Sequence, residues 1–319
     1  MSANSAAKSE KVRPVARKDM TKWQWIRREM VRNKVGYFMV APFFILFFLF
    51  TIIPVATAMV LSLTSFNLLQ LPKFVGADNY IRLFLDDDIF IIAVKNTLIF
   101  AVVIGPVSYL LSLMIAWFIN ELSPRIRSIV TLIFYVPALS GGLTAIFAML
   151  FSSDRYGHVN ALLIQFQFIT EPIQFFQDEN LVMPLCIAVA LWSSLGVTFL
   201  SFIAGLQTID SSLYEAGAID GVRNRWQELW YITLPSMKPQ LLFGAVMSIT
   251  SSFGFGAIVT QLAGFPSINY AAHTIVHHLE DYGGQRFEVG YASAIATVLF
   301  LLMVGVNLLI KKILSKVGQ

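Results

Sequence analysis

The chain has 319 residues, of which 56% are hydrophobic and 13% are charged, with a formal net charge of +4 at pH 7. Soluble domains carry about 25% charged residues, so this composition excludes a soluble protein and predicts an integral membrane protein. The single cysteine, Cys186, excludes an intrachain disulfide. Nucleic acid is not expected as a partner, because the basic residues lie beside the apolar segments.

Residues 1–34 form a basic tail with ten Lys or Arg and three acidic residues, and its first part is poor in apolar residues, as disordered segments are. From about Lys18, the apolar residues Trp23, Ile26 and Met30 recur at helical spacing between basic ones. This pattern predicts a short helix at the membrane interface, in contact with anionic lipid. The alternative is a signal peptide, but the next apolar run is longer than an h-region of about 7–15 residues.

Six apolar segments follow, and each reaches the length of about 20 residues that a bilayer requires. They predict an all-α integral membrane protein whose six transmembrane helices occupy residues 35–313, followed by a short cytoplasmic tail, 314–319. The segments are about 36–64, 93–119, 128–151, 181–206, 239–261 and 291–313.

The basic residues predict the orientation of these spans. If the N-terminus lies inside, the inner parts carry eighteen Lys or Arg and the outer parts carry five. Cytoplasmic loops are the ones rich in Lys and Arg, so both termini and the loop 209–238 are expected in the cytoplasm.

The loop 209–238 is the longest polar interval in the second half of the chain. Ser212 followed by Glu215 has the spacing of a capping box and predicts a helix that starts near Leu213. Asp220-Gly221 is expected to end this helix, because glycine tolerates the left-handed conformation.

A second helix is predicted to start where Asn224 precedes Gln227, and to end at Leu234-Pro235. The first helix, before the turn, carries small residues on one face. Its shape suits insertion into a groove on another protein. The alternative is an ordinary helical loop between two spans.

The spans lack ionisable residues apart from Lys95 at one end. This weakens a proton-driven mechanism and favours an uncharged cargo. Hydroxyls beside aromatic rings suit a sugar. The alternative is that the hydroxyls bond backbone carbonyls or allow close helix packing. The candidate pathway residues are Trp192, Ser193, Ser194, Ser251 and Ser252.

Motifs for catalysis or nucleotide binding do not occur in the sequence. It has no G-x-x-x-x-G-K-[ST] and no G-x-S-x-G. His273, His277 and His278 have no accompanying HExxH, so a solvated outer helix is favoured over a metal site. We therefore predict a non-catalytic subunit that binds no cofactor and obtains its energy from a partner.

Glu215-Ala216-Gly217, Gly221 and Ile232-Thr233-Leu234-Pro235 together resemble the EAA signature of permease subunits of binding-protein-dependent ABC importers. The family pattern is E-A-A, three residues, G, nine residues, I-x-L-P. This chain departs from it at Gly217, which replaces the second alanine, and by having ten residues between Gly221 and Ile232.

Further segments resemble the carbohydrate-uptake class of this family and cover roughly residues 35–313. They are Phe74-Val75-Gly76, Asn79-Tyr80, Leu83-Phe84, Phe90, Asn96-Thr97, Val136-Pro137-Ala138, Tyr156 to Asn160, Gly205 to Ile209 and Gly290 to Ala294. The ordered set is similar to the maltose-type permeases.

The resemblance implies a bacterial inner-membrane importer with a second homologous permease, two ATPase subunits that hold ATP and magnesium, and an extracytoplasmic solute-binding protein. It implies that the ATPase-coupling residues are Glu215, Ala216, Gly217, Asp220, Gly221, Leu234 and Pro235. The alternatives are a non-sugar cargo, such as glycerol-phosphate or polyamine, and a stand-alone facilitator.

Overall fold

The computed structural model describes residues 21–139 and 143–316 and divides into two units, residues 1–57 and 58–319. The first unit contains α1 (Lys22–Arg32), α2 (Lys34–Phe47), η1 (Phe48–Ile52) and the start of α3 (Ile53–Leu61). The segment predicted to form an interfacial helix is therefore helical as α1, which begins where the Thr21 N–H donates to Gln24 Oε1 at 3.1 Å. The part of the basic tail before Thr21 lies outside the described residues.

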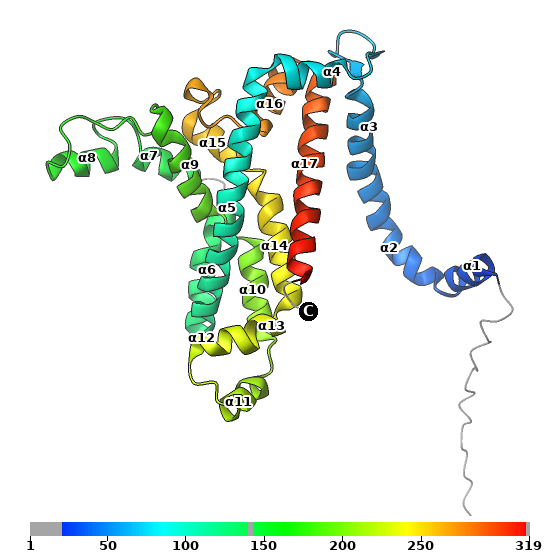
Figure 1. The fold of residues 1–319 in the computed structure, drawn as a ribbon, viewed down its shortest axis with the longest axis vertical. Helices are drawn as coiled ribbons and strands as arrows, with labels where there is room; N and C mark the ends of the chain where they lie inside the picture. Colours follow the sequence, from blue (N-terminus) through cyan, green and yellow to red (C-terminus); the bar gives the residue numbers. More distant parts are fainter. Residues whose placement is uncertain (1–20, 140–142, 317–319) are drawn as a thin grey trace, which may run out of the picture. The chain divides into compact units, whose positions relative to one another are not determined.

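Three helices pack against one another at the centre of the second unit (Figure 1): α5 (Asp88–Asn120), α10 (Val197–Gln207) and α14 (Lys238–Ser252). Small polar residues form hydrogen bonds between α10 and α14. Thr198 Oγ1 donates to the Gly244 carbonyl at 3.4 Å, and Ser248 Oγ donates to Thr198 Oγ1 at 3.3 Å. The hydroxyls therefore serve helix packing here, as between other membrane helices.

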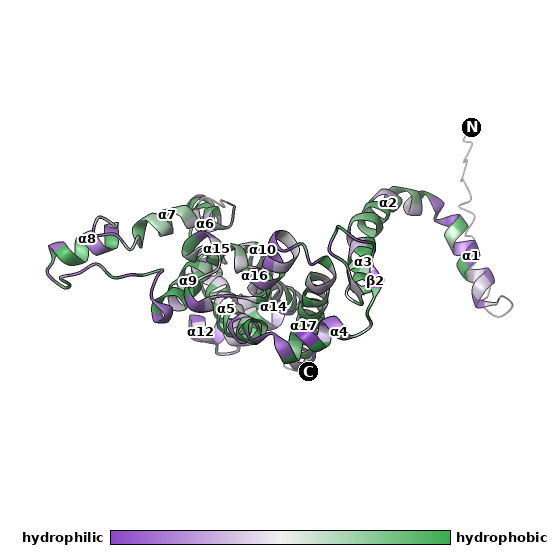
Figure 2. Ribbon diagram, turned by 90° about the horizontal axis from the view of Figure 1, so that it is seen from above, coloured by the Kyte–Doolittle hydropathy of each residue, from purple (hydrophilic) through white to green (hydrophobic). Residues whose placement is uncertain are grey.

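Four helical stretches are long and apolar enough to cross a membrane: Lys34–Leu61, Asp88–Asn120, Glu179–Gln207 and Val289–Lys312. A fifth candidate is the pair α14 and α15 (Gly256–Ala263), which is bent by 42°. These agree with five of the six predicted spans. Figure 2 shows apolar residues along α17 (Val289–Lys316) and hydrophilic ones on α12 (Arg225–Glu228).

The predicted third span, 128–151, is divided between α6 (Pro124–Leu139) and α7 (Leu143–Leu150). Residues 140–142 between these two helices lie outside the described part of the chain. The described residues therefore contain four or five candidate spans.

The end of the second unit that carries α16 (Ile275–Glu280) includes a short antiparallel ribbon in an otherwise mostly helical structure (Figure 1). Asn79 Nδ2 donates to the carbonyls of Ser62 and Thr64 at 2.8 and 2.9 Å, and these bonds hold the chain extended after α3. The other elements at or near this end are β1 (Thr64–Ser65), β2 (Lys73–Phe74), α4 (Asp78–Ile81), η2 (Arg82–Asp86), α8 (His158–Gln165), α9 (Glu179–Ser193), η4 (Ile268–Tyr270) and η5 (Asp281–Gln285).

Three histidines at this end are buried, so the prediction of a solvated helix is wrong. His273, His277 and His278 are 2%, 1% and 2% exposed. His277 and His278 lie on α16, which packs against both α5 and α17, and the His273 carbonyl accepts a hydrogen bond from Asn96 of α5. His278 Nε2 lies 2.9 Å from Asp87 Oδ2, and the Tyr291 hydroxyl donates to the same oxygen at 2.7 Å. Among the described residues, no group of three or more His, Cys, Asp or Glu is placed to hold a metal ion.

Lowering the pH is expected to destabilise this end of the protein. Burial lowers the pKa of His273 to about 3 and the pKa of His277 to about 4. An unfolded histidine has a pKa of about 6.5, so stability is lost as the pH falls from there towards the folded values, by about 2 kcal/mol per histidine at pH 5. We expect His273→Phe to weaken the fall of the thermal unfolding midpoint between pH 7 and pH 5, measured in detergent.

The matched control is His158→Phe, because His158 is exposed. This variant is expected to keep the pH dependence of the unchanged protein. Identical pH dependences for the His273 and His158 variants would contradict the assignment.

Candidate functional site

A short helix, α11 (Ser211–Ile219), projects from the end of the second unit opposite α16, and none of its residues is buried (Figure 1). The helix begins at Asp210, whose Oδ1 accepts a hydrogen bond from the Ser212 N–H at 2.9 Å. This bond also lowers the pKa of the Asp210 carboxyl. The predicted capping box of Ser212 and Glu215 is therefore wrong, because Ser212 is already the second helical residue. The side chain of Glu215 is exposed and makes no hydrogen bond or ion pair within the described residues.

The end of α11 is a Schellman motif. The Val222 N–H donates to the Gly217 carbonyl at 2.9 Å, and the Gly221 N–H donates to the Ala218 carbonyl at 3.3 Å. Gly221 has φ +95°, a conformation that L side chains rarely adopt. The predicted stop at Asp220-Gly221 is confirmed, and it leaves α11 with a defined length and direction.

A second helical segment follows and starts at the predicted residue. Asn224 Oδ1 accepts from the Gln227 N–H at 2.9 Å, and Gln227 Oε1 accepts from the Arg223 N–H at 2.8 Å. Such reciprocal bonds stabilise the first turn of a helix. The segment comprises α12, η3 (Leu229–Thr233) and α13 (Leu234–Ser236).

The predicted end of this segment at Leu234-Pro235 is wrong. Pro235 lies in the first turn of α13, where a missing N–H is tolerated, and the segment continues to Ser236. The break follows at Met237. The turn that precedes Leu234 is a π-helix, in which the Leu234 N–H bonds to the Leu229 carbonyl. A π turn accommodates one extra residue in a helix. The π turn η3 therefore explains how the helix accommodates ten residues, rather than nine, between Gly221 and Ile232.

The two helical segments contact each other through Gly217. A Cβ at this position would lie 2.5 Å from Ile232 Cδ1, so an alanine here would require the end of the Ile232 side chain to shift. Beside this contact, the hydroxyls of Tyr214 and Thr233 lie 3.0 Å apart. The face of α11 that carries Gly217 thus lies against η3, whereas Ala216 and Ala218 are exposed.

We expect Gly217→Ala and Ile232→Val to be non-additive. The alanine is overpacked against Ile232, and valine removes the methyl group that it meets, so the pair should be about 1 kcal/mol more stable than the sum of the single changes. Amide hydrogen exchange of α11 measures this opening free energy. Strictly additive changes would show that Ile232 does not restrict Gly217.

Arg225 connects this region to the end of α5. Its guanidinium lies 2.9 Å from Glu121 Oε2 and 2.6 Å from Glu228 Oε2. The hydrogen bond to Glu228 and the charge of Glu121 raise the pKa of Arg225. Trp226, its neighbour, packs against Trp117 with ring centroids 5.1 Å apart. Sequence reasoning missed Arg225, because the only local signal was its spacing to Glu228.

The candidate pathway residues lie beside two breaks in the helices. Ser193 ends α9, Ser194 follows it, and α10 begins at Val197. Ser251 and Ser252 end α14 before the bend to α15.

The side chains of these residues have different surroundings. Trp192 is 53% exposed and meets Phe147 edge to face. Ser194, Ser251 and Ser252 donate to the carbonyls of Leu191, Ser248 and Ile249 at 2.6, 3.0 and 2.7 Å. Ser252 is buried and Ser251 is exposed. The carbonyl bonds are the alternative role foreseen for these hydroxyls.

Several apolar helices are the feature of a multi-pass membrane protein, and an exposed, doubly capped helix lies at one end. Residues 108–318 match the family described as "Binding-protein-dependent transport system inner membrane component". The chain belongs to this family, and its predicted membership is confirmed.

The relatives include the probable ABC transporter permease protein YesP of Bacillus subtilis, which is 32% identical over 92% of this chain and 93% of that protein. The lactose transport system permease protein LacF of Rhizobium radiobacter is 34% identical over 69% of this chain and 72% of that protein. A crystal structure of a bacterial ABC transporter involved in the import of alginate shares the fold, with a TM-score of 0.72 and 23% identity over 92% of this chain and 100% of the other.

Proposed function

We propose that this chain is the transmembrane permease subunit of an ATP-driven importer for a mono- or oligosaccharide, and that α11 is its coupling helix. The observation that carries this proposal is the exposed α11, which is capped at Asp210 and terminated at Gly221. Such a helix transmits a displacement between two assemblies because its ends do not fray.

Each motif residue has a proposed role in this coupling. Glu215 and Ala216 contact an ATPase subunit, since both are exposed. Gly217 permits the approach of η3, and Asp220 with Gly221 makes the turn. Leu234 and Pro235 start α13 and set the path into α14.

The cargo proposal combines the uncharged spans with the relative named for lactose transport. Non-helical backbone at membrane depth is tolerated where it is buried in protein or lines a water-filled cavity. The breaks beside Ser193-Ser194 and Ser251-Ser252 are therefore proposed to lie along the sugar pathway, with Trp192 stacking on the sugar.

In the complete importer, α6 and α7 form the third of six spans, and both termini lie in the cytoplasm. This chain and a second homologous permease each contribute half of the pathway. Two ATPase subunits hold ATP and magnesium, and an extracytoplasmic binding protein delivers the sugar. This chain itself has no catalytic role.

Reconstitution in liposomes tests this function. Sugar uptake is expected only with the second permease, the ATPases, the sugar-loaded binding protein and ATP. Trp192→Ala should reduce uptake and the ATPase activity stimulated by loaded binding protein. Passive sugar flux through this chain alone would instead identify a facilitator, and a binding protein that takes no sugar would identify another cargo.

A further inference from the structure

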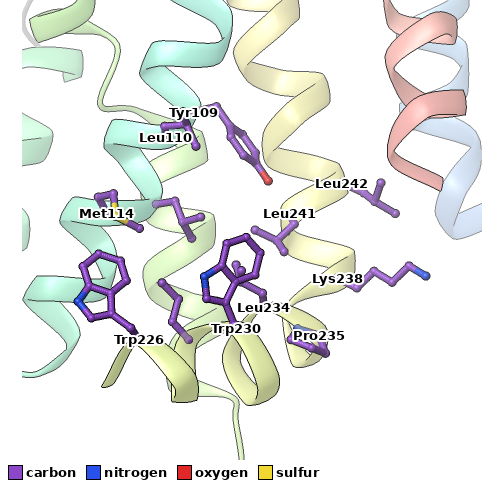
Figure 3. A pocket seen from close by; sticks show the side chains of 12 residues that line it. Tyr109, Leu110, Met114, Trp226, Trp230, Leu234, Pro235, Lys238, Leu241 and Leu242 are labelled. Carbon is purple, nitrogen blue, oxygen red and sulfur yellow. The ribbon is translucent and has the colours of Figure 1, made fainter. Parts of the chain in front are cut away.

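A cavity of about 540 Å³ opens between α5, the segment after α11 and the start of α14 (Figure 3). Figure 3 shows Trp226 and Trp230 standing beside it, with Tyr109 at its far end and Lys238 at its rim. Its other lining residues are almost all apolar and include Leu234 and Pro235 of the coupling motif.

A second cavity, of about 290 Å³, continues along the same two helices and is bounded by α17. Tyr109 lines both cavities. The lining residues on α14 are Lys238, Leu241, Leu242, Ala245 and Ile249, and Phe253 follows at its end. Among them, a stripe with a spacing of three or four residues runs through Lys238, Leu242, Ala245, Ile249 and Phe253. We call the two cavities together the α5–α14 crevice.

The crevice is long enough for an acyl chain. At a rise of about 1.5 Å per residue, the stripe from Lys238 to Phe253 extends about 22 Å along α14. One leaflet contributes about 15 Å of hydrocarbon to a bilayer. A lipid with its headgroup at Lys238 therefore reaches the centre of the membrane within the crevice.

The two ends of the crevice differ in chemistry. Trp226 and Trp230 are 56% and 67% exposed, and Lys238 lines the same end. Two further lysines, at positions 311 and 312, directly follow the lining residue Ile310. Tryptophan and lysine are enriched at headgroup depth, and lysine attracts anionic lipid. The far end, at Phe253 and Val306, is apolar.

We propose that the α5–α14 crevice binds one anionic phospholipid, with an acyl chain along the stripe and the headgroup at the basic end. The length of the crevice and its polarity gradient both match this ligand. The proposal requires that the α11 end lies at a membrane surface, and it depends neither on the cargo nor on the ATPase contact.

Photolabelling of the full chain in nanodiscs tests the proposal. The discs contain phosphatidylcholine and a minority of phosphatidylglycerol with a diazirine in its acyl chain, and mass spectrometry locates the adducts. Val102 lines the crevice and is 69% exposed, whereas Val107 lies on the same helix outside it and is 37% exposed. Val102→Trp should reduce the adducts on α5 and α14 severalfold, and Val107→Trp should leave them unchanged.

The headgroup is tested with Lys238→Gln, which should reduce the labelling roughly fivefold. Lys238→Arg should retain it. Equal labelling in the Val102 and Val107 variants would overturn the proposal, as would adducts that do not concentrate on the crevice. In the assembled importer, a cross-link from position 102 to a second permease or to residues 21–57 would assign the crevice to a protein segment instead. Loss of uptake with normal labelling would count against the proposed function alone.

Discussion

Replacing Gly221 by valine is expected to reduce ATP-driven uptake about tenfold. The φ of +95° costs a β-branched residue about 1–3 kcal/mol, and 1.4 kcal/mol corresponds to about a factor of ten. The chain escapes this strain by giving up the two bonds that end α11, so the helix loses its direction. Uptake and co-purification of the ATPase subunits measure the effect.

Two control variants distinguish loss of the turn from general destabilisation of the protein. Gly221→Asn should retain much of the uptake, because asparagine tolerates positive φ. Gly284→Val should have no effect, since a Cβ there meets nothing within 4 Å and its φ is not in the positive range. Normal uptake and assembly in Gly221→Val would refute a functional role for this turn.

Reversing the charge of Arg225 is the second change with a large expected effect. Arg225→Glu places a carboxylate beside Glu121 and Glu228, and like charges about 4 Å apart repel by about 1–4 kcal/mol near a protein surface. The region that supports α11 then separates from the end of α5, and we expect a roughly tenfold loss of uptake. The unfolding midpoint should change little, because the local separation relieves this repulsion and the lost exposed ion pairs contribute about 0–1 kcal/mol.

The exchanged pair, Arg225→Glu with Glu121→Arg, restores opposite charges across the contact and should recover most of the uptake. Arg127→Glu is a useful comparison, because Arg127 contacts Asn120 rather than a carboxylate. If the exchanged pair is as defective as Arg225→Glu, the contact between α5 and α12 does not position the coupling region.

The helix ends in the loop 209–238 could be predicted from the sequence where they depend on residues close by in the chain. Asn224 with Gln227 and the glycine at 221 predicted the start of one helix and the end of the other. The start of α11 was misplaced because Asp210 and Ser212 are both good capping residues, and side-chain pattern alone does not choose between them. Pro235 was misread as a stop, because the π turn before it is not visible in residue spacing.

Contacts between distant segments could not be predicted in this way. Burial of His273 and His277 depends on packing against α5, which lies far away in sequence. The same holds for Arg225 with Glu121 and for the crevice between α5 and α14. Gly217 is intermediate: the sequence marked it as a departure from the family pattern, and its reason became apparent only beside Ile232.

Cysteine cross-linking in the assembled importer tests the central claim, that α11 meets an ATPase subunit at the cytoplasmic surface. Cys186 is the only cysteine and is buried, so a Cys186→Ala background allows single probes. Ala218→Cys lies on exposed α11, and Tyr156→Cys is an exposed probe just before α8. We predict that Ala218→Cys cross-links to the ATPase subunit and resists an impermeant maleimide added to intact cells, whereas Tyr156→Cys reacts with the maleimide and forms no such cross-link. Labelling of Ala218→Cys from outside, without an ATPase adduct, would contradict the account.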